Sequence, residues 1–537
     1  MLLIHPPIAK PCEPPAGIAK LSGVLHSHGI LHKVLDVNIE GLLSVMQNPR
    51  PASDTWTRRA IKNLTSNMAA LRDIRTYQSF DRYSRAVRDV NHVLAVSSRD
   101  SGALLGLADY RHQHLSPVRS ADLIRAVEHP EQNPFYIYYK QRLTEVIEET
   151  FSSRRRREHP LVKHSRAGTG REEQPENGEY DEKTRVPVIG ISLNYLSQAL
   201  CTFSMIGYIK KQFPGLKIVL GGGLVSSWMK RSGWKNPFDG LVDHMIAGPG
   251  ERALLDFIGI SDSKQIHSTP DYDSMPVHDY LSPGFMLPYS GSSGCYWHKC
   301  SFCPETAEAN PYVPISAHQA IRDLAALIGK TKPVLVHLLD NAINPTHMRA
   351  LVDNPLDVPW YGFVRIDKEL LNMDYCMQLK QSGCVMLKLG LESGDQEVLD
   401  RMKKGIELST ASQVLHNLHK AGISTYVYLL FGTPYEAQKE ARRTLDFVVK
   451  HRDVISFLNL AIFNMPLCGH DAGEFETAQF YDGDLSLYTG FKHLRGWDRK
   501  RVRQFLDIEF KRHPVVSSIL RKDPPFFTSN HAAFFVR

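Results

Sequence analysis

Three cysteines within nine residues are the side chains in this sequence best suited to chemistry. Cys295, Cys300 and Cys303 lie in the run Gly-Cys-Tyr-Trp-His-Lys-Cys-Ser-Phe-Cys. A closed structural zinc site takes four protein ligands, so three thiolates from one loop are one ligand short. They can instead hold a cubane iron-sulfur cluster by three of its irons and leave the fourth open to an outside ligand. An open metal position is where a reaction can take place.

A zinc site is the alternative interpretation of the same loop, with His298 as the fourth ligand. Structural zinc sites usually bring their ligands in two separated pairs, whereas His298 lies between two of the cysteines, so the spacing favours the cluster. Cys376 and Cys384 fall within an expected helix and at an expected strand start. We expect these two to be core thiols rather than ligands.

The composition is that of an ordinary soluble protein with two to four domains. Of 537 residues, 42% are hydrophobic and 23% charged, and no apolar run approaches the roughly 18 residues of a membrane span. The chain start has neither a basic leader nor a cleavage site, so we expect a cytoplasmic protein. Much of the net charge of +7 lies in residues 154–157, and no aromatic side chains interleave with those arginines. This favours a solvated linker over a nucleic-acid surface.

Strands and helices alternate in the first 258 residues, which predicts a doubly wound, Rossmann-like parallel sheet. A long insertion, residues 41–185, interrupts it with helical spacing and then a flexible linker rich in Arg, Glu and Gly. The expected strands are 2–4, 33–37, 186–193, 217–220 and 244–247, and the expected helices are 14–29, 199–212 and 225–230.

A second alternation, over residues 287–461, predicts a partial (β/α)6 TIM-type barrel. The expected strands are 287–290, 334–339, 360–366, 385–391, 425–431 and 455–461, with helices at 317–328, 346–352, 368–382, 396–421 (broken at Gly405) and 436–450. Barrel sites lie at the carboxyl ends of the strands, and the cysteine loop follows the first strand. Residues 462–537 are expected to form a mixed C-terminal extension with a helix at 499–511.

These features together resemble the radical S-adenosylmethionine superfamily. The resemblance is carried by three cysteines with Phe302 before the last, by Gly-Leu-Glu-Ser-Gly at 390–394, and by Phe-Gly-Thr-Pro-Tyr-Glu at 431–436. Most members have three residues between the first two cysteines, and this chain has four, 296–299. The longer Gly-Cys-Tyr-Trp loop is similar to that of cobalamin-type members.

The resemblance implies that the cysteines hold a 4Fe-4S cluster whose free iron binds S-adenosylmethionine, and no catalytic residue is assigned beyond the cluster. The cofactor would contact Phe302, Asp340, Arg365, Glu392 and Gly432. Arg365 would grip the methionine carboxylate through its planar fork, Asp340 its ammonium, and Glu392 the nucleoside. The same residues also have alternative, purely structural roles. Asp340 could cap a helix, Glu392 and Glu436 could be carboxylates at a helix N-terminus, and Gly432 could form a simple turn.

The N-terminal domain resembles the cobalamin-binding module that precedes the barrel in one branch of the superfamily. Small residues at its strand ends would leave room for the corrin and its nucleotide tail, namely Ser192, Gly221, Gly222 and Gly248. The Asp-x-His-x-x-Gly motif is missing, so no histidine is expected to ligate cobalt. Residues 41–185 and 462–537 match nothing in that branch.

The implied activity is generation of a deoxyadenosyl radical and cobalamin-dependent methylation of an unactivated carbon. A radical rearrangement or cyclisation without methyl transfer is the runner-up, and a non-catalytic ligand-binding protein with a structural zinc loop is a third interpretation. The expected partners are an organic substrate and a one-electron reductant such as flavodoxin or ferredoxin, with no membrane and no nucleic acid.

Overall fold

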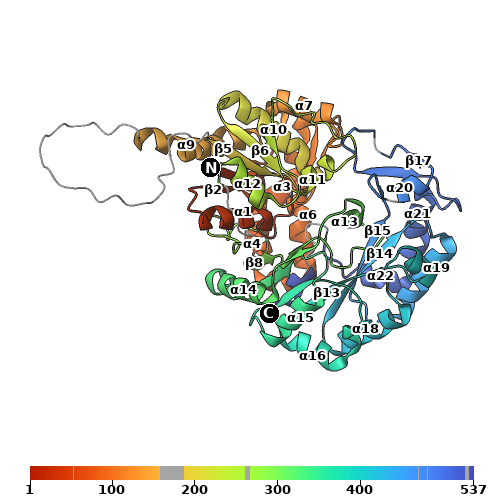
Figure 1. Cartoon of the computed structure of the whole chain (residues 1–537). Helices are drawn as coiled ribbons and strands as arrows, with labels where there is room; N and C mark the ends of the chain where they lie inside the picture. The colour runs from red at the N-terminus through yellow and green to blue at the C-terminus, as the bar shows by residue number, and fades with distance from the viewer. Residues whose placement is uncertain are drawn as a thin grey trace, which may run out of the picture.

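Two parallel sheets form the frame of the protein (Figure 1). The computed structural model describes residues 1–51, 54–157, 187–260, 267–469, 471–480, 482–525 and 531–536. The predicted linker segment after residue 157 therefore lies outside the described residues. Among the helices of the described segments, none combines the length and apolar character that a membrane span requires.

The N-terminal sheet has five parallel strands in the order β2-β1-β5-β6-β7. Its strands are β1 (Leu2–His5), β2 (Lys33–Asp36), β5 (Val188–Ser192), β6 (Lys217–Gly221) and β7 (His244–Met245). Its helices are α1 (Ala16–Ser27), α10 (Leu196–Gln212), α11 (Gly223–Met229) and α12 (Gly250–Phe257). The predicted doubly wound sheet is confirmed, with β7 shorter than expected.

Alternating side chains send the two faces of this sheet into two different cores. Leu3 and Val219 pack with α1 and α12 in a core shared with the second sheet. Leu2, Ile4 and Ile218 pack on the other face with α10 and the inserted helices. Because strand side chains alternate in direction, this split follows directly from the sequence. The insertion thus extends the core of the first sheet.

The described part of the insertion is mainly helical and also contains a hairpin that the sequence did not predict. The helices are α2 (Val37–Gln47), α3 (Thr55–Lys62), α4 (Leu64–Leu71), α5 (Ile74–Tyr77), α6 (Phe80–Ser97), α7 (Ser120–Glu128), α8 (Tyr136–Tyr138) and α9 (Thr144–Arg157). The hairpin pairs β3 (Ala103–Leu105) with β4 (Tyr110–His112). Its strands are too short to carry a clear period-two pattern.

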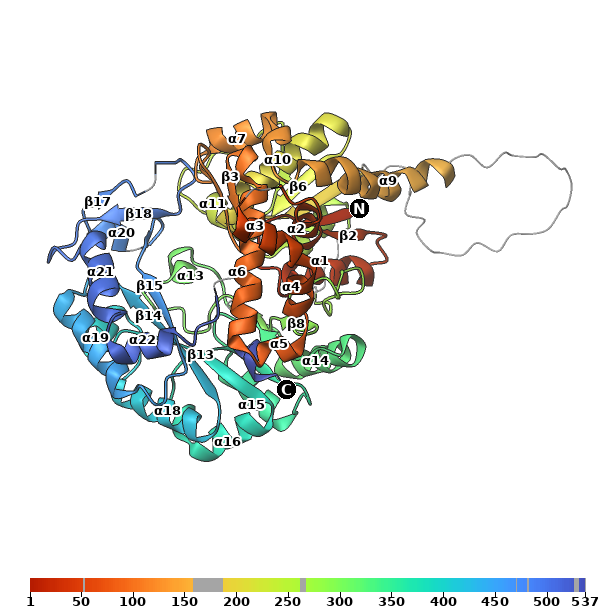
Figure 2. The ribbon, with the colours of Figure 1, turned by 180° about the vertical axis from the view of Figure 1, so that it is seen from behind.

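The second sheet has six parallel strands in the order β15-β14-β13-β12-β11-β8, as expected for a partial barrel. The strands are β8 (Met286–Tyr289), β11 (Leu335–Leu338), β12 (Trp360–Val364), β13 (Cys384–Glu392), β14 (Ser424–Phe431) and β15 (Phe457–Ile462). Its helices are α14 (Ala317–Thr331), α15 (Pro345–Asp353), α16 (Met373–Gln381), α17 (Gln396–Arg401), α18 (Leu408–Lys420) and α19 (Gln438–Lys450). Figure 2 shows α14, α15, α16, α18 and α19 along the outer side of this curved sheet.

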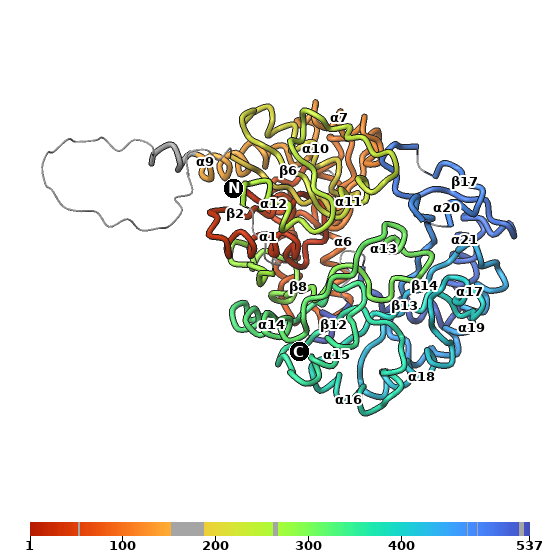
Figure 3. The backbone as a smooth tube through the Cα atoms, viewed as in Figure 1, coloured from red at the N-terminus to blue at the C-terminus, as the bar shows by residue number. Residues whose placement is uncertain are grey.

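A connector, residues 267–285, joins the two sheets and stays close to the first one (Figure 3). The Asp271 amide donates to the Ala19 carbonyl at 2.8 Å, and the Leu281 amide donates to the Pro11 carbonyl at 2.8 Å. The Tyr280 hydroxyl donates to Asp36 Oδ2 at 2.7 Å. These bonds hold the start of the barrel against the carboxyl side of β1 and β2.

The C-terminal extension returns to both halves of the protein. Helix α21 (Arg499–Phe505) continues into a wider turn over 506–510, and α22 (Pro514–Leu520) follows. Residues 531–536 enter the inside of the barrel, where Ala532 and Val536 pack with Met286, Tyr361 and Met386. The inner end of the barrel away from the cysteine loop is therefore filled by the chain's own tail.

Candidate functional site

The cysteine loop lies at the carboxyl end of the first barrel strand, as the sequence predicts. It runs from β9 (Ser292–Ser293) to the short helix α13 (Pro304–Ala307). Cys300 is buried, and Cys295 and Cys303 are half-buried. Gly294, just before the first cysteine, has φ +72°, and a Cβ there would lie 2.4 Å from the Pro311 carbonyl oxygen, so only glycine fits.

The turn between α17 and α18, residues 402–405, forms a platform under this loop. The Ser301 amide donates to the Met402 carbonyl at 3.1 Å, and Trp297 Nε1 donates to the Lys403 carbonyl at 3.2 Å. A Cβ on Gly405 would approach the Trp297 ring to 2.3 Å. The extra residue of the cysteine spacer thus accompanies a tryptophan whose indole is hydrogen-bonded to the platform.

Arg365, predicted to bind the methionine carboxylate, lies under the same tryptophan. Its guanidinium lies 3.9 Å from the centre of the Trp297 ring, and its Nη2 donates to the Lys404 carbonyl at 2.6 Å. An arginine has five N–H donors, so these contacts leave donors for a carboxylate. The structure places Arg365 beside the cysteine loop.

Glu392, predicted to contact the nucleoside, ends β13 and forms a buried ion pair with Lys404. Glu392 Oε1 and Lys404 Nζ are 2.9 Å apart, with side chains 13% and 9% exposed. The same ammonium lies 5.5 Å from the centre of the Phe302 ring. Glu392 has φ +70° beside a register shift of the strand, a backbone strain of the kind that gathers at functional sites. It is not at a helix N-terminus, so that alternative is wrong.

Two cationic side chains, Lys404 and Arg365, lie near the buried Cys300. Burial raises the pKa of the Cys300 thiol, and the charges of Lys404 and Arg365 act in the opposite direction. Burial also raises the pKa of Cys303 to about 11. Because a thiolate is the form that binds metal, the two cations favour the ligating state of Cys300.

The predicted ammonium ligand, Asp340, is buried under the start of the loop. It accepts hydrogen bonds from the Gly291 amide at 3.0 Å and from the Ser292 hydroxyl. Burial raises the pKa of its carboxyl. The capping alternative for Asp340 is wrong, because Asn344 caps α15 by accepting from the His347 amide.

Gly432 forms the turn after β14 with φ +79°, and Glu436 holds that turn. The Gly432 amide and Trp497 Nε1, at 3.1 Å, both donate to Glu436 Oε2. Glu436 is fully buried and lies two residues before α19, so the expectation of a first-turn carboxylate is wrong. The turn at Gly432 is therefore held in place by hydrogen bonds to a buried carboxyl group.

A cavity of about 530 Å³ opens over the carboxyl ends of the N-terminal sheet. All four residues predicted to make room for a corrin line it: Ser192, Gly221, Gly222 and Gly248. A Cβ on Gly222, at φ +109°, would lie 2.4 Å from the Leu193 carbonyl oxygen, so the backbone there must stay bare. A volume of this size is typical of small-molecule sites.

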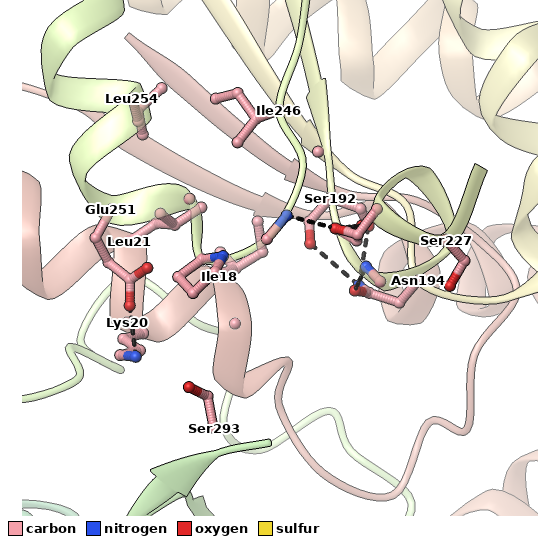
Figure 4. Close-up of a pocket in the computed structure, with 18 of the residues that line it drawn as sticks. Ile18, Lys20, Leu21, Ser192, Asn194, Ser227, Ile246, Glu251, Leu254 and Ser293 are labelled. Carbon is pink, nitrogen blue, oxygen red and sulfur yellow. Dashed lines mark hydrogen bonds and ion pairs between the residues drawn. The ribbon is translucent and has the colours of Figure 1, made fainter. Parts of the chain in front are cut away.

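The other wall of the cavity is the cysteine loop. Ser293 and Gly294 line it just before Cys295, and Pro304 and Glu305 line it just after Cys303. In Figure 4, Ser293 on its strand lies across the cavity from Ile246 and Leu254 of the N-terminal domain. The two predicted cofactor regions therefore border one space.

A comparison with known families matches the part of the chain that contains the cysteine loop and most of the second sheet. A family model described as the Radical SAM superfamily matches residues 289–448. These residues form a radical SAM domain. The match runs from the end of β8 to near the end of α19, so it covers the cysteine loop, the 402–405 platform and the Gly432 turn.

Two curated relatives of the chain are methyltransferases. An uncharacterized methyltransferase of Pyrococcus horikoshii is 24% identical over 191 residues, which cover 34% of this chain and 40% of that protein. The bacteriochlorophyllide d C-12(1)-methyltransferase of Chlorobaculum tepidum is 27% identical over 176 residues, which cover 31% and 38%. The chain thus spans about two fifths of the length of these relatives.

Among solved structures, the radical S-adenosylmethionine methyltransferase TsrM of Kitasatospora setae is similar to this chain. The superposition has a TM-score of 0.48 and 13% sequence identity, and it covers 86% of this chain and 73% of TsrM.

A radical SAM domain implies a 4Fe-4S cluster and S-adenosylmethionine, and the donor set of the loop fits that group. Three thiols share one loop, and charges interact between them. Within the described segments, no three His, Cys, Asp or Glu side chains gather around a single ion position. A cubane spreads its thiolates over separate irons, so its ligands need not converge on one point.

Sequence reasoning missed the residues that support the loop. Trp297 was noted only as part of a longer spacer, Gly405 only as a helix break, and Lys404 was not singled out. Their contacts join segments about a hundred positions apart along the chain. The predicted helix break at Gly405 was the one signal available.

Proposed function

We propose that this chain is a radical enzyme that uses cobalamin to methylate an unactivated carbon of an organic substrate. In this proposal residues 1–258 are the cobalamin-binding domain with its insertion, residues 287–461 the radical SAM barrel, and residues 462–537 an extension that closes it. A one-electron reductant such as flavodoxin or ferredoxin would supply the electron.

The observation that carries the proposal is the cavity between the two domains. Its N-terminal wall has bare backbone at Gly221 and Gly222, and its other wall is the pair of segments that flank the cysteines. A group bound over the N-terminal sheet would lie directly beside the cysteine loop. The name methyltransferase of both curated relatives supports the same activity.

The residues proposed to hold each cofactor are those that the family resemblance predicts. Cys295, Cys300 and Cys303 would ligate the cluster. The S-adenosylmethionine contacts would come from Phe302 in the cysteine loop and from Arg365, Glu392 and Gly432 at the strand ends. Asp340, buried under the start of the loop, would be the fifth contact. Ser192, Gly221, Gly222 and Gly248 would accommodate the corrin.

When bound, the cluster and S-adenosylmethionine supply a deoxyadenosyl radical, and cobalamin supplies a transferable methyl group. The chain must orient these groups and exclude water. Trp297 and Lys404 fix the loop on its platform, and the Glu392 carboxylate can accept hydrogen bonds from ribose hydroxyls once it turns from Lys404.

The test is anaerobic reconstitution of the full chain with iron, sulfide and hydroxocobalamin. After gel filtration we expect cluster absorbance and the spectrum of retained cobalamin, and with dithionite we expect deoxyadenosine. Absence of both the cluster absorbance and deoxyadenosine would refute a radical enzyme. Deoxyadenosine without retained cobalamin would instead indicate rearrangement or cyclisation.

A loop variant separates the two cofactors. Cys300→Ala should abolish cluster binding while the N-terminal domain stays folded, because the charged neighbours of Cys300 all belong to the barrel half of the chain. Cys468→Ala, an exposed cysteine outside the loop, is the matched control and should retain the cluster. A retained cluster in Cys300→Ala would contradict the assignment of the ligands.

A further inference from the structure

The inner face of the barrel carries a charged cluster that the proposed cofactors do not use. Side chains such as Val336, Leu338, Leu387 and Leu389 point to the core beneath the outer helices. The alternate positions therefore point inward. On three neighbouring strands these are His337, Tyr361 and Lys388.

The three charged or titratable groups of the cluster form a chain. Glu13, from the loop before α1, has both carboxylate oxygens at 2.9–3.0 Å from His337 Nδ1. The other ring nitrogen, His337 Nε2, lies 3.3 Å from Lys388 Nζ. The His337 ring stacks on Tyr361 with centroids 4.3 Å apart. A loop of the N-terminal domain thus reaches into the barrel and positions a lysine.

Lys388 is an unusual residue for the middle of a parallel strand. It is 2% exposed, and its ammonium lies 4.9 Å from the centre of the Tyr361 ring and 5.0 Å from that of Phe363. In the described part of the chain, His337 is its only hydrogen-bond partner. A buried ammonium has three donors and is costly unless it is paired, so two donors are available for another group.

The ammonium charge of Lys388 favours an anion as that group. Burial lowers the pKa of His337, so the imidazole is neutral near pH 7. Glu13 is hydrogen-bonded to the other nitrogen of that ring rather than to Lys388. Among the described residues no carboxylate forms an ion pair with Lys388, so an anion would suit its remaining donors.

Lys388 lies just above the filled end of the barrel. Below it the barrel is filled by Ala532, Val536 and their apolar neighbours. On the side of Lys388 that faces the cysteine loop, the inner surface of the barrel is only half-buried, at Phe363, Gly390 and Tyr428. Glu392 ends the same strand four residues further on, which is about 13 Å at 3.3 Å per residue. That separation suits a small organic molecule between the floor and the cofactor end.

We infer that Lys388, held by Glu13 and His337, binds an anionic group of the carboxylate type on the substrate at the floor of the barrel. This inference rests on the proposed function and adds the chemical class of its substrate. The anionic end would lie on Lys388, and the reacting carbon would lie toward the cysteine loop, with the aromatic faces of Phe363 and Tyr428 along its length.

The first test uses S-adenosylmethionine with a trideuterated methyl group and small-molecule extract from the source cells, separated into anionic and neutral fractions by anion exchange. We expect deuterated methyl products from the anionic fraction only. Products from the neutral fraction alone would overturn the anion site while supporting methyl transfer. No labelled product from either fraction, with no deoxyadenosine, would instead refute the proposed function.

The second test needs no substrate and uses benzoate and its neutral analogue benzamide as probes, titrated calorimetrically into the reconstituted protein. Loss of one charge-assisted hydrogen bond should weaken binding about ten- to a hundredfold. We therefore expect benzoate to bind at least tenfold more tightly than benzamide. Equal binding of the two probes, or binding of neither, would overturn the inference.

Variants assign the effect to the lysine. Lys388→Met should lose the preference for benzoate because it removes the positive charge. Lys388→Arg should keep the preference because it retains that charge. Lys420→Met, an exposed lysine on α18, is the matched control and should behave as wild type. If Lys388→Met binds benzoate as tightly as the wild type, the site is not at Lys388. Iron and cobalamin content show whether each variant is folded.

Discussion

At the scale of single residues, Trp297 gives the extra position in the cysteine spacer a physical role. Arg365 stacks on the ring, the indole N–H donates to the Lys403 carbonyl, and the bare backbone of Gly405 leaves room beside it. A stacked cation and one indole hydrogen bond are together worth about 2 kcal/mol. That is enough to decide whether a loop keeps one shape before its cluster arrives.

We therefore predict that Trp297→Ala will hold less iron and sulfide per chain after reconstitution, and that its reduced cluster will give a broadened electron paramagnetic resonance signal. Trp297→Phe keeps the stack on Arg365 and loses one hydrogen bond, so it should stay close to wild type. Iron analysis and spectroscopy measure both effects. Wild-type iron content and line shape in Trp297→Ala would contradict the prediction.

Gly405→Ala supplies an independent check of the same contact. The new Cβ would collide with the Trp297 ring, so the single variant should lose iron as Trp297→Ala does. In the double variant the collision is absent and only the strain of alanine at φ +66° remains, so the combined loss should be smaller than the sum of the two single losses. Additive losses would mean that the residues do not act through one contact.

Motif residues could be predicted from the sequence, and supporting residues could not. Cys300 and Glu392 belong to short runs whose spacing is visible along the chain. Cys376 and Cys384 were predicted to be core thiols, and both are fully buried. Trp297 and Lys388 depend on partners brought together by folding, and nothing local distinguishes them from surface or core residues.

At the scale of elements, the turn after β14 depends on one buried carboxyl. Burial raises the pKa of Glu436 to about 8, above its ordinary 4.5, although the Gly432 amide and Trp497 act against the shift. In the described part of the chain Oε1 has no hydrogen-bond partner. The folded protein therefore binds a proton at this site that the unfolded chain releases above pH 4.5.

The sign of the pH dependence follows. Between about pH 4.5 and 8 the folded state holds more protons than the unfolded state, so the contribution of Glu436 to stability falls as the pH rises. We predict that Glu436→Gln, which stays neutral, will gain in melting temperature relative to wild type from pH 5 to pH 9. Glu397→Gln, whose side chain is 70% exposed, is the control. A constant difference across this range would show that Glu436 is ionised in the fold.

The element order was predictable because buried parallel strands are short apolar runs bounded by turns and helices. All six barrel strands were found within two residues of their observed bounds, and the break near Gly405 was found as well. The hairpin β3–β4 was missed because three-residue strands carry no period. The path of residues 531–536 into the barrel was also invisible, since a tail with few residues has no pattern to place it.

At the scale of the whole molecule, that tail joins the insertion to the barrel. Phe534 packs against Tyr77 and Tyr83 of the inserted helices at ring distances of 5.3 and 5.0 Å, and its neighbour Phe535 packs against Phe457 of β15. The two domains are therefore tied at the end of the barrel opposite to the cavity.

Phe534→Ala should lower the free energy of unfolding by about 2 kcal/mol, less than for a fully buried phenylalanine because the ring is half-buried. Urea unfolding followed by circular dichroism measures the change. Leu494→Ala, at an 81% exposed position, is the control and should stay within about 0.5 kcal/mol of wild type. Equal effects of the two variants would show that the tail contact contributes nothing.

The cavity between the domains gives the last prediction, because a glycine on α1 borders its free space. Gly17 lines the cavity, and a Cβ there would meet no atom within 4 Å. Gly17→Leu should therefore fold, since leucine is a better helix former than glycine, and its side chain would occupy space proposed for cobalamin.

We expect Gly17→Leu to retain at least tenfold less cobalamin than wild type after reconstitution, while its iron content stays unchanged because the variant does not touch the cysteine loop. Gly329→Leu is the control variant outside the cavity. Gly329 also lies in a helix, α14, and a Cβ there would also meet no atom within 4 Å. It should retain cobalamin as wild type does. Normal cobalamin in Gly17→Leu would mean that the corrin, if bound, lies outside this cavity, and the shared space would no longer connect the two cofactors.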